Sequence, residues 1–176
     1  MKIMCFGDSN TWGYDPRGYF GGRYDHPWPD ILAGKLGCTI FNWGENGREI
    51  PARAVEFPAD ADLLIIMLGT NDLLQGVSPE TVCHRMKRFL EPLNREKLLL
   101  IAPPTMKVGA WVPSQKLIDD SKYLAKLYQT LAERLSVRFI DAGQWNVPLA
   151  YDGVHLTEEG HRVFAEELIE YLNKGE

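Results

Sequence analysis

Two apolar runs of strand length constrain the fold of this chain most strongly. The segments LLIIML at 63–68 and LLLIA at 98–102 do not alternate polar with apolar side chains. A strand with one face in solvent shows such alternation, whereas a parallel strand covered on both faces is apolar throughout. The two runs therefore predict the centre of a parallel sheet that has a layer of helices on each side.

Strand-length runs and helical patterns alternate along the whole sequence. The five predicted strands are residues 2–6, 38–42, 62–68, 97–102 and 137–142. Helical patterns with recognisable ends follow at 26–37, at 78–90, at 115–135 and from the cap residue Thr157 onward. Right-handed crossovers between parallel strands turn this order into a three-layer α/β sandwich with a five-stranded, flavodoxin-like parallel sheet.

Composition and charge narrow the class of partner. A chain of 176 residues that is 45% hydrophobic fits a single domain spanning residues 1–176. The net charge is −5 and no Lys or Arg run offers a surface for phosphates, so we expect no nucleic-acid partner. No apolar stretch reaches the roughly 18 residues of a membrane helix. The sequence therefore predicts a cytoplasmic protein without a membrane partner that acts on a small molecule.

Polar residues collect directly after the predicted strands. Ligands of open parallel sheets bind at the carboxyl ends of the strands, so these segments are expected to meet at one edge. They are GDSN at 7–10, NWGENG at 42–47, GTND at 69–72 and, further beyond its strand, DGVH at 152–155.

The collected residue types suit acyl transfer. Ser9 is a candidate nucleophile, but a serine hydroxyl needs a base to take its proton at neutral pH. His155 can be that base if an acceptor holds its other ring nitrogen, and Asp152 lies only three residues earlier in the chain. Alternatively, Ser9 caps a helix and His155 is a surface residue, as single residues of these types often do.

These blocks resemble a known family. GDSN, NWGENG, GTND and DGVH match, in order and spacing, the blocks of the SGNH (GDSL-type) hydrolase superfamily over nearly the whole chain. The compact cytoplasmic arylesterase and acyltransferase group is the most similar part of that superfamily, given NGR at 46–48, FIDAGQ at 139–144 and DGVHLTEEGH at 152–161. Two positions depart from the common pattern: Asn10 replaces the leucine of GDSL, and GREI replaces GRT.

The resemblance implies a role for each matched position. It makes Ser9 the nucleophile and adds Asp152 and His155 as the other members of the catalytic triad. It makes the Ser9 amide, the Gly47 amide and the Asn71 side chain the donors of an oxyanion hole. The implied mechanism needs neither a metal nor an organic cofactor. In the resembling group the pocket is narrowed by oligomers, so a homo-oligomer is implied as well.

We expect aromatic and apolar residues near the carboxyl ends of the strands to bind the acyl or aryl group of the substrate. The candidates are Trp12, Tyr14, Trp43, Leu73 and Trp111. The leading hypothesis is a serine esterase for short-chain acyl esters of small molecules or sugars, acetyl esters among them. A thioesterase or lysophospholipase is the alternative enzyme. The alternative from another class is a non-catalytic flavodoxin-like module whose first loop cradles a phosphate.

Two further carboxylates, Asp8 and Asp72, lie within the polar blocks. They could tune the pKa of a neighbour, but bracing of loops through bonds to backbone amides is the favoured interpretation. The neighbouring Ser, Asn and Gly donors suit an anion better than a cation, so the sequence does not favour a metal site.

Overall fold

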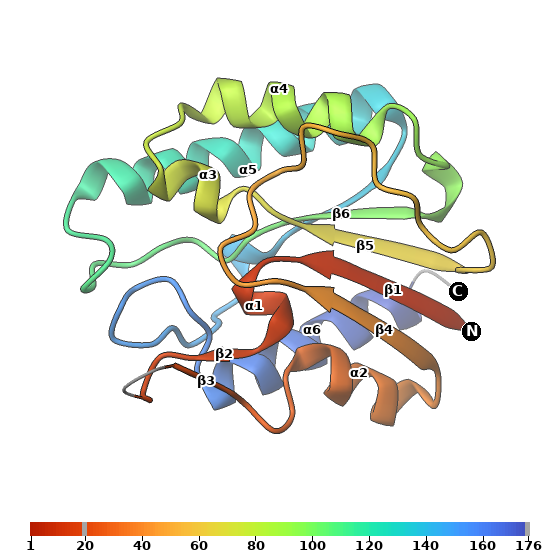
Figure 1. The fold of residues 1–176 in the computed structure, drawn as a ribbon, viewed down its shortest axis with the longest axis horizontal. Helices are drawn as coiled ribbons and strands as arrows, with labels where there is room; N and C mark the ends of the chain where they lie inside the picture. Colours follow the sequence, from red (N-terminus) through yellow and green to blue (C-terminus); the bar gives the residue numbers. More distant parts are fainter. Residues whose placement is uncertain (19–20, 175–176) are drawn as a thin grey trace.

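A five-stranded parallel sheet forms the centre of the molecule, as Figure 1 shows for the computed structural model, which describes residues 1–18 and 21–174. All neighbouring strands of this sheet run parallel. Its strands are β1 (Lys2–Gly7), β4 (Thr39–Gly44), β5 (Leu63–Met67), β6 (Leu98–Ala102) and β7 (Arg138–Asp141). Each predicted strand is present, with ends that differ by one or two residues.

The strand order is β4-β1-β5-β6-β7, which is the flavodoxin-like order. Every residue of β5 and β6 is buried, as expected for strands covered on both faces. The edge strand β4 instead alternates exposed with half-buried residues, because only one of its faces packs against the rest of the molecule. The absence of alternation thus marked the central strands correctly.

Helices cover both faces of the sheet (Figure 1). One face carries α3 (Thr70–Leu74), α4 (Pro79–Leu90) and α5 (Gln115–Leu135), and the other carries α2 (Trp28–Leu36) and α6 (Glu158–Lys174). Each face has its own core: Tyr128 and Phe89 belong to the first, Trp28 and Phe164 to the second. The three-layer α/β sandwich predicted from the sequence is therefore confirmed.

The helix ends follow local chemistry. Ser78 caps α4 by accepting a hydrogen bond from the Thr81 amide, and Pro79 occupies the first helical position. Gly37 ends α2 in a left-handed conformation that favours glycine. The side chain of Thr157 accepts from the Gly160 amide at the start of α6.

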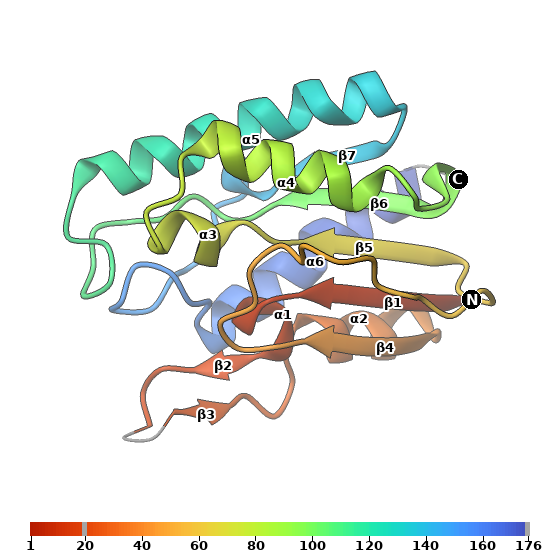
Figure 2. The same cartoon turned by 45° about the horizontal axis from the view of Figure 1, so that its top comes forward.

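A small hairpin lies between β1 and α2, where the sequence predicted no strand. Its antiparallel strands are β2 (Tyr14–Asp15) and β3 (Gly22–Arg23), which follow the single-turn helix α1 (Ser9–Trp12). Figure 2 shows the hairpin next to α1, at the end of the sheet toward which the parallel strands point. Two-residue strands leave too short a pattern to be recognised in the sequence.

Gly44 lets α1 lie directly on the end of β4. A Cβ atom at this position would be 2.1 Å from the backbone nitrogen of Trp12. We expect Gly44→Ala to lower the free energy of unfolding by about 3 kcal/mol, the upper range for overpacking, because backbone cannot move aside like a side chain. Urea denaturation measures the change.

The control is Gly34→Ala in the interior of α2, where an added Cβ meets nothing within 4 Å. Alanine is the better helix former, so this variant should gain about 0.5–1 kcal/mol. A Gly44→Ala protein as stable as the wild type would contradict the packing argument.

Candidate active site

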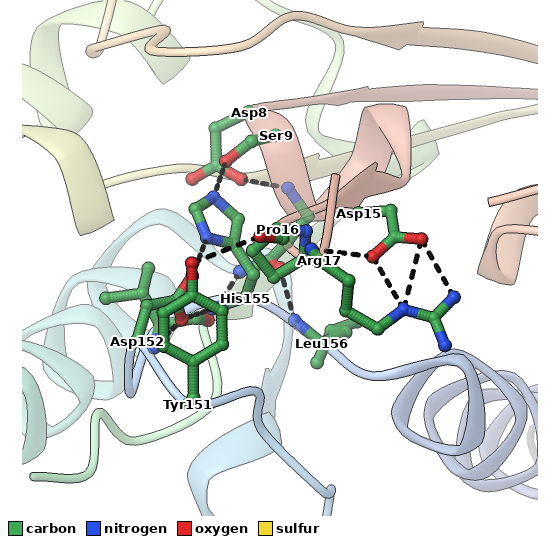
Figure 3. Close-up of polar contacts among 11 residues, drawn as sticks. Asp8, Ser9, Asp15, Pro16, Arg17, Tyr151, Asp152, His155 and Leu156 are labelled. Atoms are coloured by element: carbon green, nitrogen blue, oxygen red, sulfur yellow. Dashed lines mark hydrogen bonds and ion pairs between the residues drawn. The ribbon is translucent and has the colours of Figure 1, made fainter. Parts of the chain in front are cut away.

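Ser9, His155 and Asp152 form a continuous chain of hydrogen bonds at the carboxyl edge of the sheet (Figure 3). The Oγ atom of Ser9 lies 2.9 Å from Nε2 of His155, although the two residues are 146 positions apart in sequence. On the other side of the ring, Nδ1 of His155 lies 2.6 Å from Oδ2 of Asp152. The sequence placed these three residues together correctly.

All three side chains are almost removed from solvent: the exposed fraction is 6% for Ser9, 2% for His155 and 1% for Asp152. Burial would by itself raise the pKa of Asp152. The carboxylate nevertheless has its pKa below the usual value, because it accepts bonds from the His155 ring and from the amides of His155 and Val154. Asp152 is therefore held as an anion that fixes the proton of the imidazole on Nδ1.

Backbone hydrogen bonds between two loops hold Asp152 in position. The amide of Lys107 donates to the Gly153 carbonyl, and the amide of Trp111 donates to the Asp152 carbonyl. The two backbones approach closely at Gly109, where an added Cβ would be 2.4 Å from the carbonyl carbon of Asp152. The long segment between β6 and α5 thus supports the Asp152 loop.

Asn10 ties the segment of Ser9 to the segment of His155. Its Nδ2 donates to the Val154 carbonyl at 3.1 Å, and its Oδ1 accepts from the Leu156 amide at 2.9 Å. The position where the GDSL signature has leucine is thus a buried polar bridge between the two ends of the chain. The departure from the GDSL signature is visible in the sequence, but the role of Asn10 is visible only in the structure.

Tyr151 makes a second long-range contact that the sequence did not indicate. Its hydroxyl donates to the Pro16 carbonyl in the hairpin at 3.1 Å (Figure 3). Within the hairpin, the Tyr14 ring lies 4.6 Å from the His155 ring between centroids, and the Trp111 ring lies 4.9 Å from it. Two aromatic side chains from separate loops therefore border the imidazole.

The other three predicted binding residues lie in different surroundings. Trp12 is beside the Arg23 guanidinium, and Trp43 stacks on Phe57. Leu73 is only 2% exposed and belongs to the core cluster beneath α4 and α5, so it offers little surface to a ligand. The structure brings Tyr14 and Trp111 to His155, and it places these three elsewhere along the edge or in the core.

Gly47 and Asn71 lie on neighbouring, interlocked segments. Gly47 has a φ of 75° in the turn that the Arg48 amide closes on the Glu45 carbonyl, and a Cβ there would meet nothing within 4 Å. Asn71 donates one Nδ2 hydrogen to the Arg48 carbonyl at 3.0 Å. The second hydrogen of that amide group remains to serve another acceptor.

The two additional carboxylates brace backbone amides, as predicted. Asp8 caps α1 by accepting from the Asn10 amide. Asp72 accepts from the Ile50 amide and from Arg85. Burial raises the pKa of both carboxyl groups, that of Asp8 to about 6.

Neither a metal-binding cluster nor a membrane-spanning helix is found in residues 1–18 and 21–174. In these residues no group of three or more His, Cys, Asp or Glu side chains is arranged to hold a metal ion. Over the same residues, no helix combines the length and the apolar character required to cross a membrane.

The chain is similar in sequence and in structure to known esterases. Residues 5–163 match the sequence model of the GDSL-like lipase/acylhydrolase family. The chain belongs to this family. Membership makes it a carboxylic ester hydrolase, which favours the hydrolase hypothesis over the non-catalytic phosphate-binding module. A comparison with curated proteins found no match.

Two solved structures are similar to this chain over nearly their full length. The aryl esterase of M. smegmatis is 26% identical, with a TM-score of 0.81 and coverage of 98% of both chains. A carbohydrate acetylesterase family member from Sinorhizobium meliloti is also 26% identical, with a TM-score of 0.78 and coverage of 98% of this chain and 97% of that one.

The raised pKa of Asp8 leads to a pH-dependent prediction. Between the ordinary value of 3.8 and about 6, the folded protein keeps a proton that the unfolded chain releases. Ionisation of Asp8 therefore lowers stability as the pH rises through this window. Asp8→Asn removes that penalty, and its stability relative to wild type should increase between about pH 4 and 6 and then level off, by at most about 3 kcal/mol.

Urea denaturation of both proteins across the pH range measures this difference. Asp25→Asn is the control, because it removes an exposed carboxylate and reports the effect of charge alone. A stability difference between Asp8→Asn and wild type that stays constant with pH would contradict the assignment.

Proposed function

We propose that this family member is a serine esterase that hydrolyses short-chain acyl esters, acetyl esters among them, of small molecules or sugars. The observation that carries the proposal is the buried chain of hydrogen bonds from Ser9 through His155 to Asp152, with 2.9 Å and 2.6 Å between the bonded atoms. This is the arrangement that converts a serine hydroxyl into a nucleophile at neutral pH.

In the proposed reaction, Oγ of Ser9 attacks the ester carbonyl carbon while Nε2 of His155 takes the hydroxyl proton. Asp152 accepts the Nδ1 proton and stabilises the imidazolium that forms. The imidazolium then gives its proton to the leaving alcohol, and an acyl-enzyme remains on Ser9. Water attacks this ester with His155 as base, and the acid leaves as the serine proton is restored.

Three donors are proposed to stabilise the negative oxygen of the tetrahedral intermediate. The Ser9 amide is at the first position of α1, where an N–H has no partner within the helix. The Gly47 amide lies within a turn at a position where an added Cβ would meet nothing within 4 Å, and Asn71 has a second N–H besides the one bonded to the Arg48 carbonyl. Donors of this kind act most strongly at an edge shielded from water.

A short acyl group is supported by the surroundings of His155. The rings of Tyr14 and Trp111 lie within 5 Å of the imidazole centroid on two loops, which restricts the space beside the reacting atoms. The Tyr151–Pro16 bond holds the hairpin that carries Tyr14. The name of one similar structure, a carbohydrate acetylesterase family member, agrees with a small acyl group.

The central test combines a covalent probe with a substrate panel. We expect a fluorophosphonate to label wild-type protein once, as seen by intact mass, and to leave Ser9→Ala unlabelled. The same variant should lose nitrophenyl acetate hydrolysis, because it lacks the hydroxyl that is proposed to form the acyl-enzyme. Ser114→Ala, at the start of α5, serves as the matched control and should be labelled like wild type.

The panel consists of nitrophenyl esters of increasing chain length together with acetylated sugars. The kcat/KM value should be highest for acetyl or propionyl esters. Highest values for long acyl chains, or for thioesters, would instead support a lysophospholipase or a thioesterase.

Asn71→Ala tests the oxyanion donor. Loss of one such donor typically costs roughly 2.7–4 kcal/mol of transition-state stabilisation, or about 10²–10³ in rate. We expect kcat and kcat/KM to fall together while KM changes little, since the bond forms only in the transition state. Activity within about twofold of wild type would remove Asn71 from the mechanism. Asn173→Ala on the exposed end of α6 is the control.

A further inference from the structure

A cavity of about 450 Å³ lies between the segment after β4 and one side of α4. The chain at 49–54 forms one wall, and the second half of α4 forms the other. Figure 1 shows this segment, in orange, leading away from the carboxyl edge toward α4. None of the residues lining the cavity belongs to the Ser9–His155–Asp152 chain. The cavity is therefore separate from the candidate active site.

Positive charge is concentrated in this cavity, although the whole chain has a net charge of −5. Its lining contains three arginines against a single carboxylate, together with one histidine: Arg53, Arg85, Arg88, Glu49 and His84. The remaining lining residues are apolar and include Phe89. A cavity lined by both guanidinium groups and apolar side chains is suited to a ligand that has an anionic head and a small carbon skeleton.

The three arginines differ in their partners. Arg85 donates to the buried carboxylate of Asp72 at 2.8 Å and to the exposed carboxylate of Glu49 at 3.2 Å. Arg85 thus has a structural role, because the Asp72 carboxylate that it contacts also accepts a hydrogen bond from the Ile50 amide. Neither Arg53 nor Arg88 takes part in a salt bridge within residues 1–18 and 21–174. The contacts of the described residues assign no structural role to these two guanidinium groups.

We propose that this cavity binds a small organic anion, a carboxylate or phosphate monoester with a short apolar group, held by Arg53 and Arg88. Planar guanidinium groups bind both headgroups with paired hydrogen bonds. The volume of about 450 Å³ is within the range of small-molecule sites. The proposal concerns a second site and does not depend on the proposed reaction at Ser9.

The test measures binding of phenyl phosphate and benzoate by isothermal titration calorimetry at low salt. Phenol and inorganic phosphate are the matched probes that lack the charge or the apolar group. We expect at least one of the two aromatic anions to bind about tenfold more tightly than phenol and than inorganic phosphate, since each of those lacks one of the two interactions. The tighter of the two anions identifies the preferred headgroup.

Arg53→Gln/Arg88→Gln should weaken that binding about tenfold, and it leaves the structural bonds of Arg85 intact. The control Lys35→Gln/Arg138→Gln removes the same charge from exposed positions on α2 and β7. It should bind like wild type, as should Ser9→Ala. Equal weakening in both double variants would reduce the effect to net charge and overturn the proposal. Equal affinity for phenol, or no measurable binding of either anion, would overturn it as well.

Discussion

The side chain of Asn10 joins the segment of Ser9 to the segment of His155, and the geometry of the candidate active site depends on this link. It is 3% exposed and bonds to the Val154 carbonyl and the Leu156 amide, residues that flank His155. Buried hydrogen bonds of this kind are costly to leave unmade, because water cannot replace the lost partner. The distance between Ser9 and His155 is therefore set by the neighbours of both residues rather than by the pair itself. A serine and an imidazole on separate, unlinked loops would keep this distance only part of the time.

The order of the strands explains why the polar segments meet. β1 and β5 are neighbours at the centre of the sheet, and the chain leaves them toward different layers of helices. This is the switch point at which open α/β sheets form a crevice. Ser9 follows β1 and Asn71 follows β5, so both are at this point. The segment from β4 adds Gly47, and Asn71 itself bonds to the carbonyl of the residue after that glycine.

Charged side chains away from the reacting atoms stabilise the loops at the carboxyl ends of the strands. Arg48 donates to the Gly7 carbonyl at 3.0 Å, and its guanidinium lies 4.2 Å from the Phe6 ring centroid. Arg85 reaches the buried Asp72 from α4 and fixes the residue beside Asn71. Arg85 also lines the cavity that is proposed to bind anions, and residues 49–54 form another part of its wall. One segment thus joins the active edge to the cavity proposed to bind anions.

The sequence by itself determined the layers and the strand runs, because burial on both faces leaves an apolar pattern in β5 and β6 that needs no tertiary information. It also indicated Ser9, Asp152 and His155, since the chemistry of proton transfer requires these residue types and Asp152 is close to His155 in the chain. Only the tertiary structure decided that Tyr14 and Trp111 border the imidazole, that Leu73 is in the core, and that Asn10 and Tyr151 fasten loops across 144 and 135 residues. The physical reason is that periodicity records whether a side chain is buried, whereas contacts between distant loops leave no periodic trace.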